Sequence, residues 1–431
     1  ASFREIIERD KVVVQEGSES VGMAGGWRLS NWGDEVTLEY GKAIRGYSAT
    51  HGKYRVFGSN GPIGWTSEAL TQGPGVILGR KGAYRGVEYW REPFWVIDTA
   101  YYLVPKTELD MRWLYYAVKH YKLGEVDDGS PIPSTTRTAV YMLELDVPPK
   151  PEQRAIAHIL GTLDDKIELN RRRNQTLEAM ARALFKDWFV DFGPVRAKIE
   201  GREPYLPADL WALFPDRLDD EGKPAGWEMR TVSECFSLTM GQSPPGDTYN
   251  DISDGLPFFQ GRTDFGFRYP ENRKYCSAPT RIANAEDTLV SVRAPVGDIN
   301  LAWEKCCVGR GVAAIRHLSG ARSFTYHATW SLQDELKQYE HTGTVFGAIN
   351  KNQFEAMELI EPSRALIDAY EHRIGPFDDK VRNNIAESRT LAQLRDTLLP
   401  KLISGELRIA DAKKFIERAE CRTASQTRRV L

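Results

Sequence analysis

Two short stretches of the sequence carry residue types that serve metal-dependent cleavage or methyl transfer in DNA-modifying enzymes. Pro215-Asp216 and Glu221-Gly-Lys223 supply carboxylates and a lysine, as a nuclease metal site requires, but their spacing is short and they stand in the Pro/Gly-rich stretch 193–226. Asp146-Val-Pro-Pro149 contains residue types that hold a flipped base in a methyltransferase, but in the wrong order. We interpret the first stretch as a linker and the second as the end of a globular domain.

Other patterns typical of catalysis or metal binding are missing from the sequence. The chain has no Gly-x-x-x-x-Gly-Lys-Ser/Thr loop of the kind that cradles ATP phosphates. Its seven histidines show no close ligand spacing, and its five cysteines form no Cys-x-x-Cys pair. We therefore expect no catalytic residue, no metal and no cofactor, and we favour a function in binding.

Length and composition indicate a multidomain protein without a membrane span. The 431 residues suffice for about two to four domains, and no stretch approaches the roughly 18 uninterrupted apolar residues of a membrane helix. Residues 2–10 are too charged for a signal peptide, so we expect a cytoplasmic protein. The net charge is −3, so any affinity for DNA must come from local patches or from a partner.

The sequence repeats itself. Trp27 and Gly41 recur 200 residues later as Trp227 and Gly241. Each half begins with a region, 27–147 or 227–361, that is rich in Gly, Pro, aromatic and β-branched residues. These regions predict short strands joined by tight turns, with some helix, for instance over 111–120 and 324–339. Generic β-rich globules remain an alternative.

Each half continues with a helical segment that has a heptad stripe of apolar and amide residues, typical of a coiled-coil seam. The candidate seam positions are Leu163, Ile167, Asn170, Asn174, Leu177 and Leu184 in the first half, and Phe377, Val381, Asn384, Ser388, Leu391 and Leu398 in the second. Arg395 interrupts the second stripe. One such stripe could pack on a globular body, but two equivalent stripes favour pairing with each other.

An antiparallel pair would bring the polar seam residues together. Asn170 would then face Ser388, and Asn174 would face Asn384, in a layer that fixes the register. We also expect Gly161 and Gly375, which match in the repeat, to break or kink the helices.

The paired aspartates after the first glycine suit the start of a helix. Thr162 to Asp165 has the residue types of a capping box, and carboxylates are stabilising at a helix N-terminus. We favour this interpretation over a catalytic carboxylate pair.

One helical segment resembles the specificity (S) subunits of Type I restriction-modification systems. It begins with the sequence Leu163-Asp-Asp-Lys-Ile-Glu-Leu-Asn170 and continues to Met180 and Phe185. The segment from Thr397 to Leu407 is similar to the second long helix of that family. The resemblance implies a non-catalytic subunit with two target-recognition domains that each read one half of a bipartite site in double-stranded DNA. It implies as partners the modification (methyltransferase) subunits, expected to be two, and the restriction subunits of an ATP-dependent endonuclease.

The expected fold class is α+β, with two mixed, loop-rich globular target-recognition domains and two long helices that form an antiparallel coiled coil in a pseudo-twofold internal repeat. The expected parts are a first target-recognition domain (1–150), a first spacer helix (151–192), a linker (193–226), a second target-recognition domain (227–362), a second spacer helix (363–410) and a basic tail (411–431). The alternative is a non-enzymatic coiled-coil scaffold or assembly factor without DNA specificity.

DNA-binding candidates follow from chemistry, because Arg, Lys, Asn and Gln read base edges whereas Ser, Thr and Tyr contact phosphates. In the first domain they are Lys42, Arg45, Tyr47, Ser59, Asn60, Arg80, Lys81, Tyr84, Arg85, Thr135, Thr136 and Arg137. In the second they are Gln242, Ser243, Gln260, Arg262, Thr263, Arg293, Thr344, Asn350 and Lys351. A solvated surface charge is the competing interpretation of each.

Overall fold

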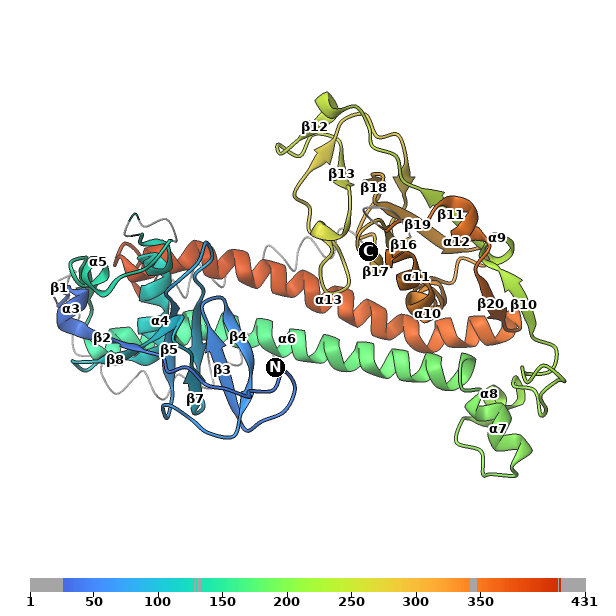
Figure 1. The fold of residues 1–431 in the computed structure, drawn as a ribbon, viewed down its shortest axis with the longest axis horizontal. Helices are drawn as coiled ribbons and strands as arrows, with labels where there is room; N and C mark the ends of the chain where they lie inside the picture. The colour runs from blue at the N-terminus through green and yellow to red at the C-terminus, as the bar shows by residue number, and fades with distance from the viewer. Residues whose placement is uncertain (1–25, 128, 130–132, 342–346, 410, 412–431) are drawn as a thin grey trace. The chain divides into compact units, whose positions relative to one another are not determined.

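The computed structural model describes residues 26–127, 129, 133–341, 347–409 and 411 (Figure 1). The chain divides into two compact units. The first unit contains the chain up to Asn170 together with the chain from Ala386, and the second contains Arg171–Ile385. Thr344 and the tail after Asp411 lie outside the described residues. None of the helices in the described ranges is long and apolar enough to span a membrane.

The first unit is built from short strands, a few short helices and one segment of each long helix. Its elements before the long helix are β1 (Arg28–Asn31), α3 (Trp32–Glu35), β2 (Val36–Tyr40), β3 (Tyr54–Gly58), β4 (Gly61–Thr66), β5 (Gly75–Gly79), β6 (Val87–Trp90), β7 (Phe94–Val96), β8 (Ala100–Pro105), α4 (Met111–His120), η2 (Leu123–Glu125), α5 (Arg137–Tyr141) and β9 (Glu144–Val147). They form an antiparallel sheet in the order β2-β8-β5-β6, a sheet β4-β3-β7 and a pair β1-β9.

The core of the first unit lies between the four-stranded sheet, helix α4 and the long helices. Strand β5 is buried along its whole length, whereas β2 buries alternate residues such as Val36 and Leu38. Helix α4 has the bounds expected from the sequence, and its first turn is capped by Asp110, whose carboxylate accepts from the amides of Arg112 and Trp113.

The second unit repeats the four-stranded sheet and the strand pair of the first. Its elements are β10 (Glu228–Thr231), α9 (Val232–Cys235), β11 (Phe236–Met240), η3 (Gly246–Thr248), β12 (Tyr249–Asn250), β13 (Leu256–Phe259), η4 (Arg262–Asp264), β14 (Tyr275–Cys276), β15 (Ile282–Ala283), β16 (Thr288–Val292), β17 (Val296–Leu301), β18 (Cys306–Val308), β19 (Val312–His317), α10 (Arg322–Ser331), α11 (Gln333–Gln338), η5 (Tyr339–His341), α12 (Lys351–Glu355) and β20 (Glu358–Glu361). The sheet β11-β19-β16-β17 and the pair β10-β20 match β2-β8-β5-β6 and β1-β9 of the first unit. The other sheet of the second unit has five strands, β12-β14-β13-β18-β15, in place of three.

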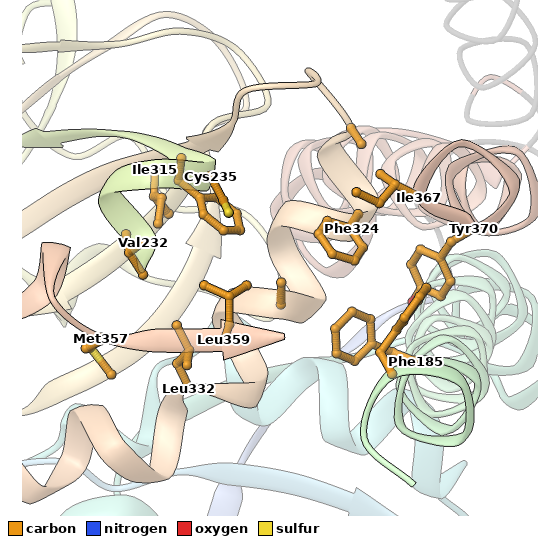
Figure 2. Packing of buried hydrophobic residues seen from close by; sticks show 14 of the residues in the cluster. Phe185, Val232, Cys235, Ile315, Phe324, Leu332, Met357, Leu359, Ile367 and Tyr370 are labelled. Carbon is orange, nitrogen blue, oxygen red and sulfur yellow. The ribbon is translucent and has the colours of Figure 1, made fainter. Parts of the chain in front are cut away.

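One hydrophobic core joins the second domain to its own segments of the long helices. Figure 2 shows Phe185 and Tyr370, from the two helices, facing Phe324 of α10 and Ile367. The Phe185 and Tyr370 rings lie 5.6 Å apart, edge to face. The helix segments are therefore part of the domain core.

The two long helices, α6 (Lys150–Phe189) and α13 (Arg364–Ile403), pair antiparallel within each unit. In the first unit Asp164 accepts from Arg395 at 2.7 Å, and Asn170 donates to Ser388 at 3.3 Å. The residue numbers rise along one helix as they fall along the other. The expected fold class, an internal repeat of mixed domains with an antiparallel pair of long helices, is confirmed.

The prediction that Gly161 and Gly375 break the helices is wrong, because α6 and α13 continue through both positions. The capping box is also wrong, since Thr162 lies inside α6 and donates to His158 O at 2.8 Å. At Gly161 an added Cβ would lie 2.5 Å from the Arg112 guanidinium, so this glycine makes room for a tertiary contact. Packing overrides the low helix propensity of glycine here.

Residues 193–226 are ordered and packed in the second unit. They contain α7 (Gly193–Ile199) and α8 (Ala208–Ala212), and Val195, Leu210 and Phe214 are buried. The indole of Trp188 meets Phe214 edge to face at 5.3 Å. This segment contributes to a core, and the carboxylates noted in its sequence hold no metal-binding cluster among the described residues.

Candidate nucleic-acid interface

In the first unit, three chain segments meet at one end of the four-stranded sheet. Strand β8 runs antiparallel to both β2 and β5, so the carboxyl ends of β2 and β5 lie beside the start of β8. The loops that begin at Gly41 and Arg80 therefore leave the sheet together. Loops placed in this way on a rigid sheet are typical carriers of binding residues.

Backbone and side-chain bonds tie these loops to two further segments. Arg80 N donates to Thr99 O at 3.0 Å, and Thr135 N donates to Arg80 O at 2.9 Å. Lys81 N donates to the hydroxyl of Ser59 in the β3–β4 turn at 3.2 Å, and Lys81 forms a β-bridge with Ser134. The structure thus brings together the candidates at 59–60, 80–84 and 135–137.

The centre of this end is an aromatic–arginine cluster of four residues, namely Tyr40, Arg80, Tyr101 and Arg137. The guanidinium carbons of Arg80 and Arg137 lie 5.1 and 4.2 Å from the centre of the Tyr40 ring. The rings of Tyr40 and Tyr101 are 5.0 Å apart. Tyr40 is 45% exposed, so the cluster opens to solvent. Cation–π contacts of this kind hold an arginine head in a defined place.

Sequence reasoning missed both tyrosines of the cluster. Tyr40 ends a strand and Tyr101 lies within one, whereas candidates were sought in loops. The pKa of the Tyr40 phenol is lowered, first by the hydrogen bond with Tyr101 and then by the charges of Arg137 and Arg80. The Tyr101 hydrogen bond is the largest cause of this shift, and the two arginine charges add to it.

Several first-domain candidates already have structural partners. Arg85 donates through Nε to Gly124 O at 2.6 Å, and the buried hydroxyl of Thr135 donates to Val126 O at 3.1 Å. The side chain of Thr136 caps α5, and Arg137 Nε donates to Leu38 O at 2.6 Å. The bonds of Arg85, Thr135 and Thr136 support the loops, so these side chains are less available for DNA than the exposed Lys81, whereas Arg137 keeps its terminal guanidinium nitrogens beside Tyr40.

The candidates in the loop after β2 are exposed. Lys42 is anchored through its backbone, which donates to Val96 O at 2.8 Å and accepts from Trp95 Nε1 at 2.7 Å. Its ammonium group stays on the surface, as does the side chain of Arg45. Tyr47 is 40% exposed and Tyr84, in the loop after β5, is 80% exposed. All four are placed where a ligand can reach them.

The second unit has an equivalent loop end. Gly241 N donates to Val312 O at 3.0 Å, and the next residue, Gln242, is exposed. Arg293 follows β16, is exposed and forms a β-bridge with Ala348 that matches the Lys81–Ser134 bridge. The structure thus brings Gln242 and Arg293 to the same end of their sheet.

Neighbouring segments add polar groups to this end. Gln260 accepts from Gly311 N at 3.0 Å through its backbone while its side chain is exposed. Ser243 accepts from Arg310 Nε at 3.1 Å. The sequence did not single out Arg310, because its loop is distant in sequence from Ser243.

The remaining second-domain candidates have internal roles. Arg262 pairs with Asp298 at 3.0 Å, and Thr263 O accepts from Arg273 at 3.4 Å. Asn350 forms a complete capping box with Gln353 at the start of α12, and the neighbouring Lys351 pairs with Glu355 at 3.3 Å. The DNA role of all nominated residues stays a prediction.

The seam candidates of the long helices are all buried or half-buried. Both polar pairings expected from an antiparallel register are present, because Asn170 donates to Ser388 at 3.3 Å and Asn384 donates to Asn174 Oδ1 at 2.8 Å. Arg395, which interrupts the second stripe, turns to Asp164 at 2.7 Å.

Matched arginines fix each domain to its own helix segment. Arg112 of α4 donates to Gly161 O at 2.8 Å and to Asp165 at 2.7 Å. In the second unit Arg322 of α10 contacts Gly375 O at 3.4 Å and Asp379 at 2.5 Å. The aspartates are therefore docking points on the helices. The sequence analysis assigned the aspartates to a helix start because their arginine partners are distant in sequence.

A buried ion cluster strengthens the second unit. Arg268 is 1% exposed and donates to Glu178 of α6 and to Asp378 of α13. Its guanidinium lies 3.7 Å from the centre of the Tyr326 ring. Burial opposes the charge of Arg268, but Tyr326, Asp378 and Glu178 raise its pKa overall. The cation therefore stays charged and joins the domain to both helix segments.

Known proteins are similar to this chain in sequence. Residues 27–179 match the model of the Type I restriction modification DNA specificity domain. The putative type I restriction enzyme MjaX specificity subunit of Methanocaldococcus jannaschii is 26% identical over 313 residues, 70% of each chain. The Type I restriction enzyme HindI specificity subunit of Haemophilus influenzae is 28% identical over 341 residues, 67% of this chain and 74% of that one.

The chain is thus similar in sequence to the specificity subunits of Type I restriction enzymes. The crystal structure of the Type I restriction-modification S subunit from M. genitalium has the same fold, with a TM-score of 0.59 and 18% identity over 89% of this chain and 98% of that chain. The family model matches residues 27–179, and the second unit repeats the four-stranded sheet and the strand pair of that region. The specificity-domain fold is thus present twice.

Proposed function

We propose that this chain is the sequence-specific DNA-recognition subunit of a Type I restriction-modification complex, in which each domain reads one half of a bipartite site. The observation that carries the proposal is the duplicated loop end. The exposed Lys42 and Lys81 in the first unit have Gln242 and Arg293 as their counterparts in the second. Two copies of one reading fold with different side chains suit a site made of two different half-sequences.

The chemistry of these loops fits recognition of double-stranded DNA. Lysine and arginine contact guanine edges and phosphates, and glutamine pairs with adenine. The net charge of −3 argues against strong binding by non-specific attraction alone. Specific contacts and a partner subunit would supply the remaining affinity.

The pair of long helices is proposed to set the distance between half-sites and to dock the partner subunits. Its polar layer, with Asn174 and Asn384 bonded across the seam, fixes one register. The named relatives are subunits of Type I restriction enzymes, so we propose modification and restriction subunits as partners. We further propose that the chain is non-catalytic and, since its ligand is DNA, cytoplasmic.

Methylome mapping tests the proposal. Cells that carry this chain and its cognate methyltransferase subunit should methylate a motif of two short specific sequences separated by an unspecified spacer. Cells with the methyltransferase alone serve as the control and should show no such motif. Methylation that is identical with and without this chain would leave the scaffold alternative and contradict a role in DNA recognition.

A further inference from the structure

Among the described residues of the second unit, apolar residues take the places of Tyr40, Arg80 and Tyr101 of the aromatic–arginine cluster. The matching backbone bonds place Val292 where the first unit has Arg80, because Arg80 N donates to Thr99 O as Val292 N donates to Gly311 O. The strand registers likewise place Met240 and Ala313 at the positions of Tyr40 and Tyr101. Val292 and Ala313 are buried in the second core, so apolar residues at these positions pack well in this fold.

The cluster is therefore not explained by folding. A half-buried guanidinium costs desolvation energy, and Arg80 Nε has no hydrogen-bond partner among the described residues. A valine at this place avoids that cost, as Val292 shows in the second unit. A charged group that the fold replaces with valine in its second copy, and that opens to solvent, is a candidate for binding a ligand.

The ligand must be an anion held near two fixed cations. Arg80 and Arg137 both lie against the ring of Tyr40, which is 45% exposed, so two cations stand together at a solvent-accessible place. Glu39 is the nearest acid that pairs with the cluster, at 3.7 Å from Arg137, and its side chain is 44% exposed. Glu39 compensates the charge of Arg137 in part and does not pair with Arg80.

The arginine heads are folded back, which favours a phosphate over a base edge. Arg137 already uses Nε on Leu38 O, and both guanidinium groups are held against Tyr40. An arginine that reads guanine extends into the major groove and offers two parallel donors. A fixed pair of cations beside a phenol suits the compact charge of a phosphodiester.

We propose that Arg80, Arg137 and Tyr40 hold one phosphodiester of the DNA backbone at the first half-site and thereby position that domain on the duplex. This inference rests on the proposed function and goes further, because it assigns the cluster to backbone positioning and assigns the base reading to other loop residues. It also makes the two domains unequal, since the described part of the second has Val292, Met240 and Ala313 at the positions of Arg80, Tyr40 and Tyr101.

The test measures binding of duplex DNA by the full chain in complex with its methyltransferase subunits, over salt from about 50 to 200 mM. For wild type, the logarithm of the association constant should fall linearly with the logarithm of the salt concentration. Arg80→Gln should weaken binding by about tenfold at low salt and make the slope shallower by about 0.9, the value of one lost phosphate contact. The loss should be equal on specific and non-specific duplexes.

Three variants complete the design. Arg80→Lys keeps the charge and should keep the slope, and Tyr40→Phe should weaken binding without changing the methylated motif. Arg55→Gln is the matched control, because Arg55 is also stacked on an aromatic ring, 4.7 Å from the centre of Trp65. Arg55 lies near the start of β3, whereas Ser59, which contacts Lys81, follows the end of that strand. It should leave affinity and slope as in wild type.

The outcomes separate this inference from the function on which it rests. An unchanged slope for Arg80→Gln in a complex that still binds its site would overturn the phosphate contact alone. Relaxed specificity at one base pair of the first half-site would overturn it in favour of base reading. A wild-type complex without sequence-dependent binding would remove the proposed function itself.

Discussion

At the scale of single residues, Glu35 shows how the fold uses a buried charge. Its side chain is 1% exposed and accepts hydrogen bonds from Arg28, from Ser30 at 2.6 Å and from Thr107 at 2.5 Å. Burial alone would raise its pKa, but the three donors overcome that effect and lower the pKa to about 2. The carboxylate therefore connects α3, on which it lies, with β1 and with the segment that follows β8.

The pH dependence of Glu35 follows from the sign of this shift. A carboxyl group whose pKa is lower in the folded chain stabilises it fully above the unfolded value, near 4.5, and loses this contribution as the pH falls towards 2. Glu35→Gln should lower the stability of β1 and β9 by about 1–3 kcal/mol at pH 7. Hydrogen exchange of these strands measures the loss, which should shrink as the pH falls from about 4.5 towards 2. A loss of equal size at pH 7 and near pH 2 would contradict the assignment.

Arg268 gives a second prediction at this scale. Arg268→Ala leaves the buried carboxylates of Glu178 and Asp378 without their shared cation, so the second unit should lose about 3–5 kcal/mol. Arg273→Ala is the control, because its pair with Glu271 is exposed and should be worth less than about 1 kcal/mol. Urea unfolding followed by hydrogen exchange measures both. Equal losses would show that burial of the Arg268 pair is unimportant.

Residue-level reasoning from the sequence found exposed loop candidates but missed residues that act through distant partners. Lys81 and Arg293 lie in loops with recognisable turn residues, so the local sequence was enough to predict them as candidates. Arg268, Tyr40 and Tyr101 acquire their roles from partners many residues away, which no local pattern reveals. Only the folded chain shows that these residues are brought together.

At the scale of elements, the two matched glycines of the long helices differ in their surroundings. A Cβ at Gly161 would lie 2.5 Å from Arg112, whereas a Cβ at Gly375 would meet only Arg322, at 3.9 Å. Gly375→Ala should therefore stabilise the chain by about 0.5–1 kcal/mol through helix propensity. Gly161→Ala should displace Arg112 from Asp165 and end at least about 1 kcal/mol less stable than Gly375→Ala. Thermal unfolding measures the stability of both variants. An equal gain in stability for Gly161→Ala and Gly375→Ala would contradict this account.

The polar seam gives a second prediction about elements. Asn174→Ala removes the partner of the Asn384 amide in a buried layer and should cost about 1–3 kcal/mol. The double variant Asn174→Leu/Asn384→Leu should regain that energy, because a buried amide pair fixes the register of the helices more than it stabilises them. Denaturant unfolding of the single and double variants measures the coupling. Additive losses would indicate that the two amides do not interact.

The sequence predicted the long helices well because their signal is periodic and local. The polar pairings of Asn170 and Asn174 followed from counting heptads in an antiparallel register. The helix break at Gly161 was a wrong prediction because intrinsic propensity was weighed without the tertiary contact from Arg112. Helix ends depend on such contacts, and these are invisible in one sequence.

At the scale of the whole molecule, one folding pattern occurs twice with different surfaces. The two four-stranded sheets have the same order and the same loop end, while the side chains at that end differ, as Arg80 and Val292 illustrate. The repeat was visible in the sequence through its helices and paired tryptophans. The positions that distinguish the two domains became comparable only when backbone hydrogen bonds aligned them.

The central claim is that each copy reads its own half-site, and a domain exchange tests it most directly. Residues 27–147 are replaced by the equivalent region of another family member, and the methylome of cells carrying the chimera and the cognate methyltransferase is mapped. We predict that one half of the bipartite motif changes while the other half stays as in wild type. A change in both halves, or in neither, would contradict the account.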